Sequence, residues 1–103
     1  MPLGRLAVRL DELKPDRATV EAWLEVYRLW YRDALCLAAG GDPSLLVNVD
    51  RQEDLTALAA RAPLAALADV LAGLREAGLA LEGHVGPRLV LEQTLAGLPA
   101  RAA

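Results

Sequence analysis

The sequence predicts an all-α protein, a single-domain bundle of about five helices, and three observations support this. Leu and Ala supply 22 and 20 of the 103 residues and Phe is absent, a composition that favours closely packed helices over a β-sandwich. The stretch from residue 16 to residue 40 holds the longest unbroken helical pattern. Prolines and glycines divide the rest of the chain into segments of helix length, so residues 1–103 are predicted to form one helical domain.

The first segment, residues 1–13, carries leucines at helical spacing. These are Leu3, Leu6, Leu10 and Leu13. No capping residue precedes them, so residues 1–14 are interpreted as the end of a leading helix that begins upstream. Pro15 ends this helix, because proline lacks a backbone N–H and disfavours helical geometry at the residue before it.

The segment from Asp16 to Gly40 is predicted to be the most buried helix. Apolar residues recur on it at the i, i+3, i+4, i+7 spacing and cover roughly half of its circumference. They are Val20, Trp23, Leu24, Tyr27, Trp30, Tyr31, Ala34, Leu35 and Ala38. Asp16 or Thr19 is expected to cap the N-terminus, and Gly40 to supply the left-handed residue after the C-terminus. Because Trp30 lies on the apolar face, its replacement by Ala is expected to cost about 3–5 kcal/mol.

The segment from Ser44 to Val49 is apolar, but the sequence offers no second strand to pair with it. It is therefore predicted to be a buried connection. Asp50, with Glu53 three residues later, predicts a capping box that opens a helix ending near Ala62. The inward positions of this helix are predicted to be Leu55, Leu58 and Ala59.

The last two helices are predicted to begin at prolines. Pro63 is expected at the first position of a helix that ends near Leu81, and Pro87 starts a final helix after a turn over residues 83–86. Residues 100–103 are expected to form a frayed tail. The predicted core positions are Leu64, Leu67, Val70, Leu71, Leu74 and Leu81 in the first of these helices, and Leu89, Leu91, Leu95 and Leu98 in the second.

Composition and charge argue against several functions. The net charge is −3 and the basic residues are scattered, so no nucleic-acid surface is predicted. One cysteine permits neither an internal disulfide nor a cysteine-based zinc site. No signal peptide is recognisable, and the longest apolar run, residues 34–39, is far too short to span a bilayer. A cytoplasmic protein without membrane or direct nucleic-acid contacts is therefore expected.

No pattern in the sequence indicates catalysis, a cofactor or a metal. His84 is the only histidine and lies in a glycine-flanked turn without a ligand or acid-base partner in its own segment, so it is interpreted as an ordinary turn residue. Cys36 lies near a helix C-terminus, where a thiolate is disfavoured, and is interpreted as structural. The sequence contains no phosphate-binding glycine motif, no nucleophile elbow and no His-Glu-x-x-His motif.

Two helix surfaces are candidate interfaces with protein partners. The helix over residues 16–40 carries a charged stripe, which is more often a solvated surface, and a second edge around its cysteine, which is the better interface candidate. The helix over residues 64–81 carries an alanine-rich face with two acidic residues. Small residues allow another helix to approach closely, although alanine is also a good helix former at exposed positions. The candidate interface residues are Arg28, Leu29, Arg32, Asp33, Cys36, Asp69, Ala72 and Glu76.

Three blocks of sequence occur in a recognisable order. The first, W-x-R-D-x-L-x-L-x-x-G, comprises Trp30, Arg32, Asp33, Leu35, Leu37 and Gly40; the second, L-x-N-x-D, comprises Leu46, Asn48 and Asp50; the third, P-R-L-x-L-E, comprises Pro87, Arg88, Leu89, Leu91 and Glu92. Together they resemble the C-terminal domain of the delta-prime subunit of the bacterial DNA polymerase III clamp loader, over nearly the whole chain. Gly86 departs from the polar residue that the family often carries before the proline.

The resemblance implies a role without chemistry. Such domains form a collar that joins the subunits of the loader, which places the sliding clamp on primed DNA, while the ATPase modules lie upstream. The chain is accordingly expected to be a C-terminal fragment of a longer AAA+-type subunit. It has no expected enzymatic activity of its own, within a holoenzyme that is a DNA-directed DNA polymerase.

The partners that the resemblance implies are the gamma/tau and delta subunits, with a homodimer possible for the isolated chain. Two alternatives remain open. One is the collar domain of the related gamma/tau subunit, and the other is a free-standing helical adaptor or dimerisation module unrelated to replication.

Overall fold

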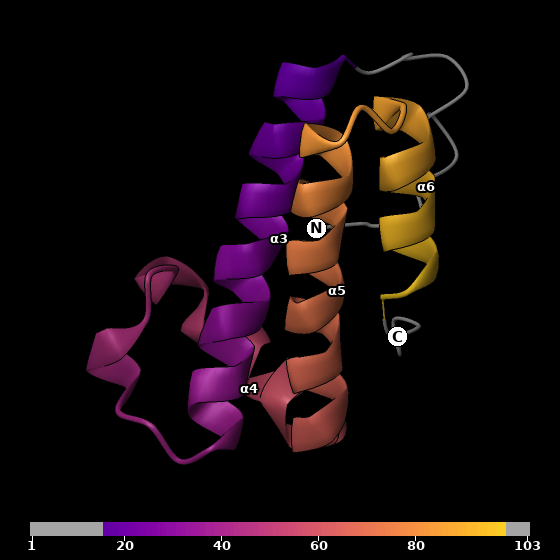
Figure 1. Cartoon of the computed structure of the whole chain (residues 1–103). Coiled ribbons are helices and arrows are strands. Elements are labelled where there is room, and N and C mark those ends of the chain that lie inside the picture. The colour runs from indigo at the N-terminus through magenta and orange to yellow at the C-terminus, as the bar shows by residue number, and fades with distance from the viewer. Residues whose placement is uncertain (1–15, 99–103) are drawn as a thin grey trace.

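The computed structural model describes residues 16–98, which form helices joined by turns (Figure 1). The α-helices span Arg17–Ala38 (α3), Gln52–Arg61 (α4), Leu64–Glu82 (α5) and Pro87–Ala96 (α6), and two 3₁₀ turns span Pro43–Leu45 (η1) and Val49–Arg51 (η2). The predicted all-α fold is confirmed, and residues 16–98 contain no strand. The helix expected over residues 1–13 and the tail expected over residues 100–103 lie outside the described residues.

Local sequence sets both ends of α3. The Asp16 carboxylate accepts a hydrogen bond from the Thr19 backbone N–H at 2.8 Å and caps the first turn. At the other end Gly40 adopts a φ of 84°, and the N–H groups of Gly40 and Gly41 donate to carbonyls of the last turn. This is a Schellman motif, in which the left-handed residue costs glycine no steric penalty. The predicted stop at residue 40 is confirmed.

The core lies between α3 and α5, with α4 and α6 flanking this pair (Figure 1). Its buried apolar residues are Val20, Leu24, Tyr27, Tyr31, Ala34, Leu46, Leu55, Leu58, Leu67, Val70, Leu74, Leu81, Val90 and Leu91. Tyr27 and Tyr31 are the buried aromatic residues, whereas Trp23 and Trp30 are only partly buried and border the core. Burial raises the pKa of Tyr27 to about 12, and the neighbouring Tyr31 adds to the shift.

The connection between α3 and α4 differs from the predicted buried segment. Leu46 is buried, but Leu45, Val47 and Val49 are exposed. Leu46 has extended backbone angles between the two 3₁₀ turns, which include Leu45 and Val49. It is the one residue of this connection that is buried in the core.

The predicted capping box at the start of α4 is wrong. The 3₁₀ turn η2 includes Asp50, so α4 begins at Gln52 and no side chain caps it. Arg51 occupies the capping position and its side chain makes no capping hydrogen bond, while Asp50 lies one residue further back, inside the 3₁₀ turn. Arg51 instead forms an ion pair with Asp54 in the first turn, at 2.7 Å. The rest of the prediction holds, since α4 ends at Arg61 and buries Leu55 and Leu58.

The last two helices lie where expected, with small rotations of the predicted faces. Pro63 directly precedes α5 rather than opening it, and Leu64 is exposed. In α6 Val90 is buried in place of Leu89, which is exposed. A ten-residue helix with apolar side chains at three successive positions has more than one possible apolar stripe, and packing against α5 selects between them.

Candidate protein–protein interface

Asp33, buried on α3, organises the connection that follows this helix. Its carboxylate accepts hydrogen bonds from the backbone N–H groups of Val47 at 3.0 Å and Asn48 at 2.8 Å. It also accepts from the Asn48 side-chain amide at 2.8 Å and from the Arg32 guanidinium at 2.9 Å. Arg32 donates in addition to the Leu45 carbonyl at 2.9 Å. Two adjacent side chains of α3 therefore hold the connection in place, and we call this set of contacts the Asp33 hub.

Two opposing effects act on the pKa of Asp33. Burial disfavours the charged carboxylate, but the hydrogen bonds from Asn48, Val47 and Arg32 favour it more strongly, and the pKa lies below its ordinary value. The carboxylate is thus ionised at neutral pH and faces the Arg32 guanidinium. Loss of the buried carboxylate would leave the backbone N–H groups of Val47 and Asn48 without this acceptor, so the hub favours a single conformation of the connection.

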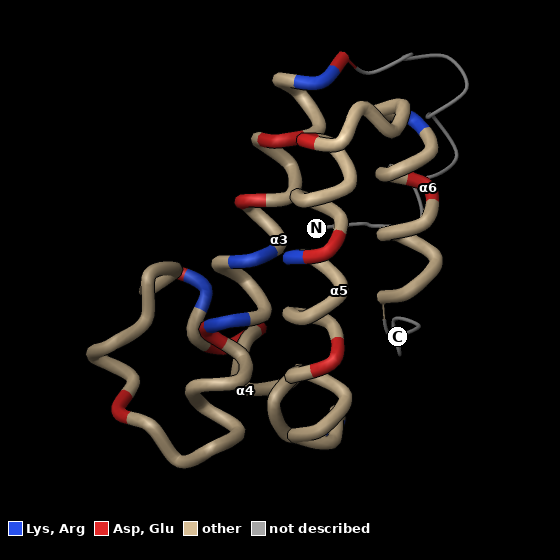
Figure 2. The backbone as a smooth tube through the Cα atoms, in the orientation of Figure 1, with Lys and Arg blue, Asp and Glu red and all other residues tan. Residues whose placement is uncertain are grey.

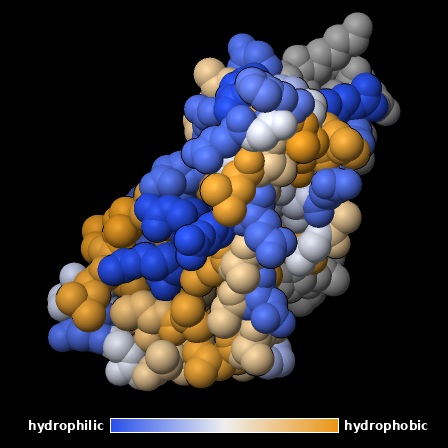
Figure 3. Space-filling model, in the orientation of Figure 1, coloured by the Kyte–Doolittle hydropathy of each residue, from blue (hydrophilic) through white to orange (hydrophobic). Residues whose placement is uncertain are grey.

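Three large apolar side chains stand outward from the connection that the hub holds. Leu45, Val47 and Val49 are 58%, 52% and 62% exposed, and we call them the 45–49 ridge. The space-filling view shows apolar side chains at the outer edge of the segment between α3 and α4 (Figure 3). Exposed apolar side chains that are grouped and rigidly held are typical of protein-binding surfaces.

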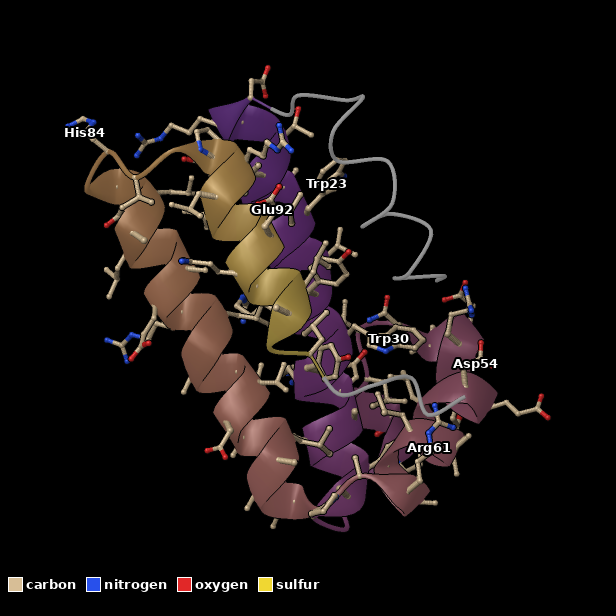
Figure 4. The ribbon with its side chains drawn as sticks, turned by 90° about the vertical axis from the view of Figure 1, so that its right-hand side faces the viewer. Trp23, Trp30, Asp54, Arg61, His84 and Glu92 are labelled. Carbon is tan, nitrogen blue, oxygen red and sulfur yellow. The ribbon has the colours of Figure 1, made fainter. Side chains whose placement is uncertain are left out.

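Trp30 closes the space between α3 and the first turn of α4 (Figure 4). The Arg51 guanidinium carbon lies 5.6 Å from the centre of its ring, within cation–π range. Trp23, seven residues earlier on α3, is also partly buried and packs against the core. Both tryptophans therefore border the core instead of lying within it.

The structure places the predicted interface residues of α3 in different environments. Arg28 is exposed and pairs at 2.6 Å with a carboxylate one turn earlier on the helix. Leu29 and Cys36 are partly buried. Asp33 differs from the expectation, because it is fully buried and its oxygens are occupied within the chain. Arg32 and Asp33 both contact the connection that carries the 45–49 ridge.

The predicted interface residues of α5 lie along a second surface. Asp69 and Glu76 line a groove of about 480 Å³ between α5 and α6, whereas Ala72 is exposed on α5 and does not line it. Acidic positions lie on the α6 side of α5 in the tube view (Figure 2). Of the predicted residues, Asp69 and Glu76 therefore belong to the groove with α6, and Arg32 and Asp33 to the Asp33 hub.

The 45–49 ridge is the surface that sequence reasoning missed. Leu45 lies in the 3₁₀ turn η1 and Val49 in η2, so no single period describes this segment. Because Leu46 is apolar too, the sequence appears continuously hydrophobic and gives no sign of which residues face outward.

Residues 16–98 contain no group of three His, Cys, Asp or Glu side chains that could hold a metal ion. His84 is exposed in the turn after α5, with a left-handed φ of 69°, as its interpretation as a turn residue requires. No single helix in this part of the chain is long and apolar enough to cross a bilayer, and α5 reaches that length together with the preceding helical segment only across a 113° bend.

Comparison with protein families identifies this arrangement of helices. A family model described as DNA polymerase III, delta subunit, C terminal, matches residues 6–98, which include α3 to α6. The chain belongs to this family. Comparison with curated proteins and with solved structures finds no match. Its membership connects the chain with the DNA polymerase III machinery of replication.

The internal contacts of this polymerase III domain explain its three sequence blocks. Asp33 of the first block accepts hydrogen bonds from Asn48 of the second, and Leu46 of the second block is buried in the core. In the third block Pro87 occupies the first position of α6, and Leu91 is fully buried. The blocks that carry the resemblance therefore hold the fold together.

Proposed function

We propose that this chain is the collar domain of a delta-prime-type clamp-loader subunit and that it acts without chemistry, by binding other subunits. In this role it joins gamma/tau and delta subunits in one assembly, which places the sliding clamp on DNA. The observation that carries the proposal is the family match over residues 6–98. The described part of that span is one helical bundle with outward-facing apolar side chains.

The 45–49 ridge gives the physical argument for a protein partner. Its three side chains are each more than half exposed, and burying them against a partner would remove apolar surface from water. The Asp33 hub already orders this segment, so binding would order little additional chain. Arg32, whose side chain is 42% exposed, adds a polar border next to the ridge.

The delta-prime assignment is finer than the matched family, which is described for the delta subunit. It is supported by the order of the three blocks that begin at Trp30, Leu46 and Pro87. The two alternatives differ in their partners. A gamma/tau collar would take the place of gamma/tau in the assembly, and an unrelated adaptor would bind neither gamma/tau nor delta.

Reconstitution tests the proposal directly. The purified chain is mixed with gamma/tau and delta subunits, and the mixture is analysed by sedimentation equilibrium. We expect one complex that contains all three components, formed without a requirement for ATP. If the chain sediments alone at every concentration, the collar function is wrong.

A matched pair of substitutions locates the contact. Val47→Lys places a charge in the 45–49 ridge, and Leu79→Lys places one at a similarly exposed apolar residue of α5. We expect Val47→Lys to weaken assembly by about tenfold or more and Leu79→Lys to leave it unchanged, with similar melting temperatures. If Val47→Lys binds as well as the wild type, the 45–49 ridge is not the contact. The collar function is then still decided by whether the wild-type chain assembles.

A further inference from the structure

The groove between α5 and α6 is a second surface, separate from the 45–49 ridge, and its lining combines apolar residues with the polar residues Asp69, Glu76, Gln93 and Thr94. α5 has 19 residues and α6 has 10, so part of α5 continues past the end of α6 (Figure 1). Buried core side chains form the floor of the groove, and small residues line its α5 wall. The floor residues are Val70, Leu74 and Val90, and the wall residues are Gly73, Ala77 and Ala80. Such a smooth wall allows another backbone to come close.

Gly73 lies within α5 although the fold of the described chain does not need glycine there. A Cβ built at this position meets no atom within 4 Å. Glycine in a helix interior destabilises the helix relative to alanine, because it loses more conformational freedom on folding. The missing side chain therefore serves no packing within residues 16–98, and it leaves the backbone of α5 open towards the groove.

Two carboxylates that border the same groove have no partner within the described residues. Asp69 and Glu76 have neither an ion pair nor a hydrogen bond within residues 16–98, whereas Glu25 and Glu92 each pair with an arginine on their own helix. They are seven residues apart on α5, which corresponds to two helical turns and roughly 10 Å along one side. Gly73 lies between them in the sequence. The groove thus combines an apolar floor, a small-residue wall and a negatively charged edge.

We propose that this groove receives one helix of another clamp-loader subunit. A small apolar side chain of that helix packs over Gly73, and Arg or Lys side chains two turns apart face Asp69 and Glu76. The identity of the partner as a clamp-loader subunit rests on the proposed function. The chemistry of the partner helix is inferred from the charge and shape of the groove. Basic residues two turns apart on a helix that lies alongside α5 would have the same spacing as Asp69 and Glu76, so both ion pairs could form together.

Charge argues against a second copy of the chain as the occupant. Two α5 helices packed through this surface would bring Asp69 and Glu76 of both copies together, and like charges in contact are unfavourable. The five residues after Leu98 are another possible occupant, because Leu98 itself lines the groove. The experiment separates these cases from a basic helix of a different subunit.

The test compares two glycines of α5 in the complete chain. Gly73→Ala narrows the groove, whereas Gly78→Ala adds a methyl group that also meets nothing within 4 Å and does not line the groove. Both substitutions should keep or raise the melting temperature. We expect Gly73→Ala to weaken binding to the purified gamma/tau and delta subunits by about tenfold, and Gly78→Ala to leave it unchanged. Gly73→Leu should weaken binding further, with the melting temperature as its folding control.

A charge arm completes the test. The double variant Asp69→Asn with Glu76→Gln should bind more weakly and should lose most of the salt dependence that the wild-type complex shows. If the wild type binds gamma/tau and delta, and both glycine variants bind them with the same affinity as the wild type, the groove proposal is wrong and the collar function stands. If the wild type does not bind them, the collar function is wrong as well. Loss of the Gly73 effect in a chain ending at Leu98 would assign the groove to the chain's own tail. If Gly73→Ala changes self-association of the chain instead of its binding to gamma/tau and delta, the groove is the contact with a second copy. Either of these outcomes overturns the proposal.

Discussion

At the scale of single residues, the Asp33 carboxylate joins α3 to backbone groups 14 and 15 positions further along the chain. Asp33→Asn keeps the shape of the side chain, but it removes the charge opposite Arg32 and turns an amide N–H group towards donors. We expect it to lower the free energy of unfolding by about 2–3 kcal/mol, measured by urea denaturation with circular dichroism. Asp69→Asn is the control, because Asp69 is exposed and has no partner within residues 16–98; it should change stability by less than about 0.5 kcal/mol.

The same carboxylate predicts how stability depends on pH. Burial acts to raise the pKa of Asp33, but the hydrogen bonds from Asn48, Val47 and Arg32 outweigh it, so the folded pKa lies below the ordinary 3.8. The stabilisation is therefore fully present above about pH 4 and is lost as pH falls through the folded pKa. We expect the melting temperature to fall below about pH 4, and to fall less in Asp33→Asn than in the wild type.

An equally steep fall in the variant would contradict this assignment. It would place the acid sensitivity at exposed carboxylates whose pKa values are also lowered by local hydrogen bonds. These are Asp16, which accepts from Thr19, Asp42, which accepts from Ser44, and Glu25, which accepts from Arg28.

At the scale of elements, the end of α3 sets the direction of the connection. A Cβ on Gly41 would lie 2.5 Å from the Cys36 sulfur and 2.8 Å from the Cys36 carbonyl oxygen, which already accepts the Gly41 N–H. Gly41→Ala must therefore open the last turn of α3, and we expect a loss of about 1–3 kcal/mol in thermal unfolding. Gly78→Ala should be neutral or stabilise by up to about 1 kcal/mol. Equal stability of the two variants would show that the turn relaxes without cost.

The aromatic residues of α3 give a second prediction at this scale. Tyr31 is 3% exposed, whereas Trp30 is only partly buried at the edge of α4. Tyr31→Ala is expected to cost about 3–5 kcal/mol, and Trp30→Ala less, because a partly exposed side chain leaves a smaller cavity. Urea denaturation of the two variants gives the order directly. A larger loss in Trp30→Ala would mean that its contact with α4 and Arg51 outweighs complete burial.

At the scale of the whole molecule, the proposed function predicts binding to protein partners and no response to nucleotide. The purified chain is expected neither to hydrolyse ATP nor to gain stability from Mg-ATP. Saturating gamma/tau and delta subunits should instead raise its melting temperature, because a ligand that binds only the folded state stabilises it, by about 2.7 kcal/mol at one hundred times Kd. An increase in melting temperature with Mg-ATP alone would contradict the proposed function.

The sequence by itself determined the features that depend on neighbouring residues. Leu and Ala composition predicted an all-α fold, and proline and glycine positions predicted where α3, α5 and α6 begin or end. The N-cap at Asp16 and the left-handed turn at Gly40 were predictable because each depends on a few adjacent backbone groups. The order of the three blocks also indicated the DNA polymerase III family before any contact was known.

Only the tertiary structure decided which side of each element faces the core and what the buried charge does. Periodicity gives the angle between residues on one helix, but the direction of the core depends on where the other helices lie. For this reason Tyr31 rather than Trp30, and Val90 rather than Leu89, are buried. Asp33 tolerates burial because its donors come from the distant connection, and the same contacts hold the 45–49 ridge outward. Both features depend on chain segments that meet only after folding, so local sequence could not show them.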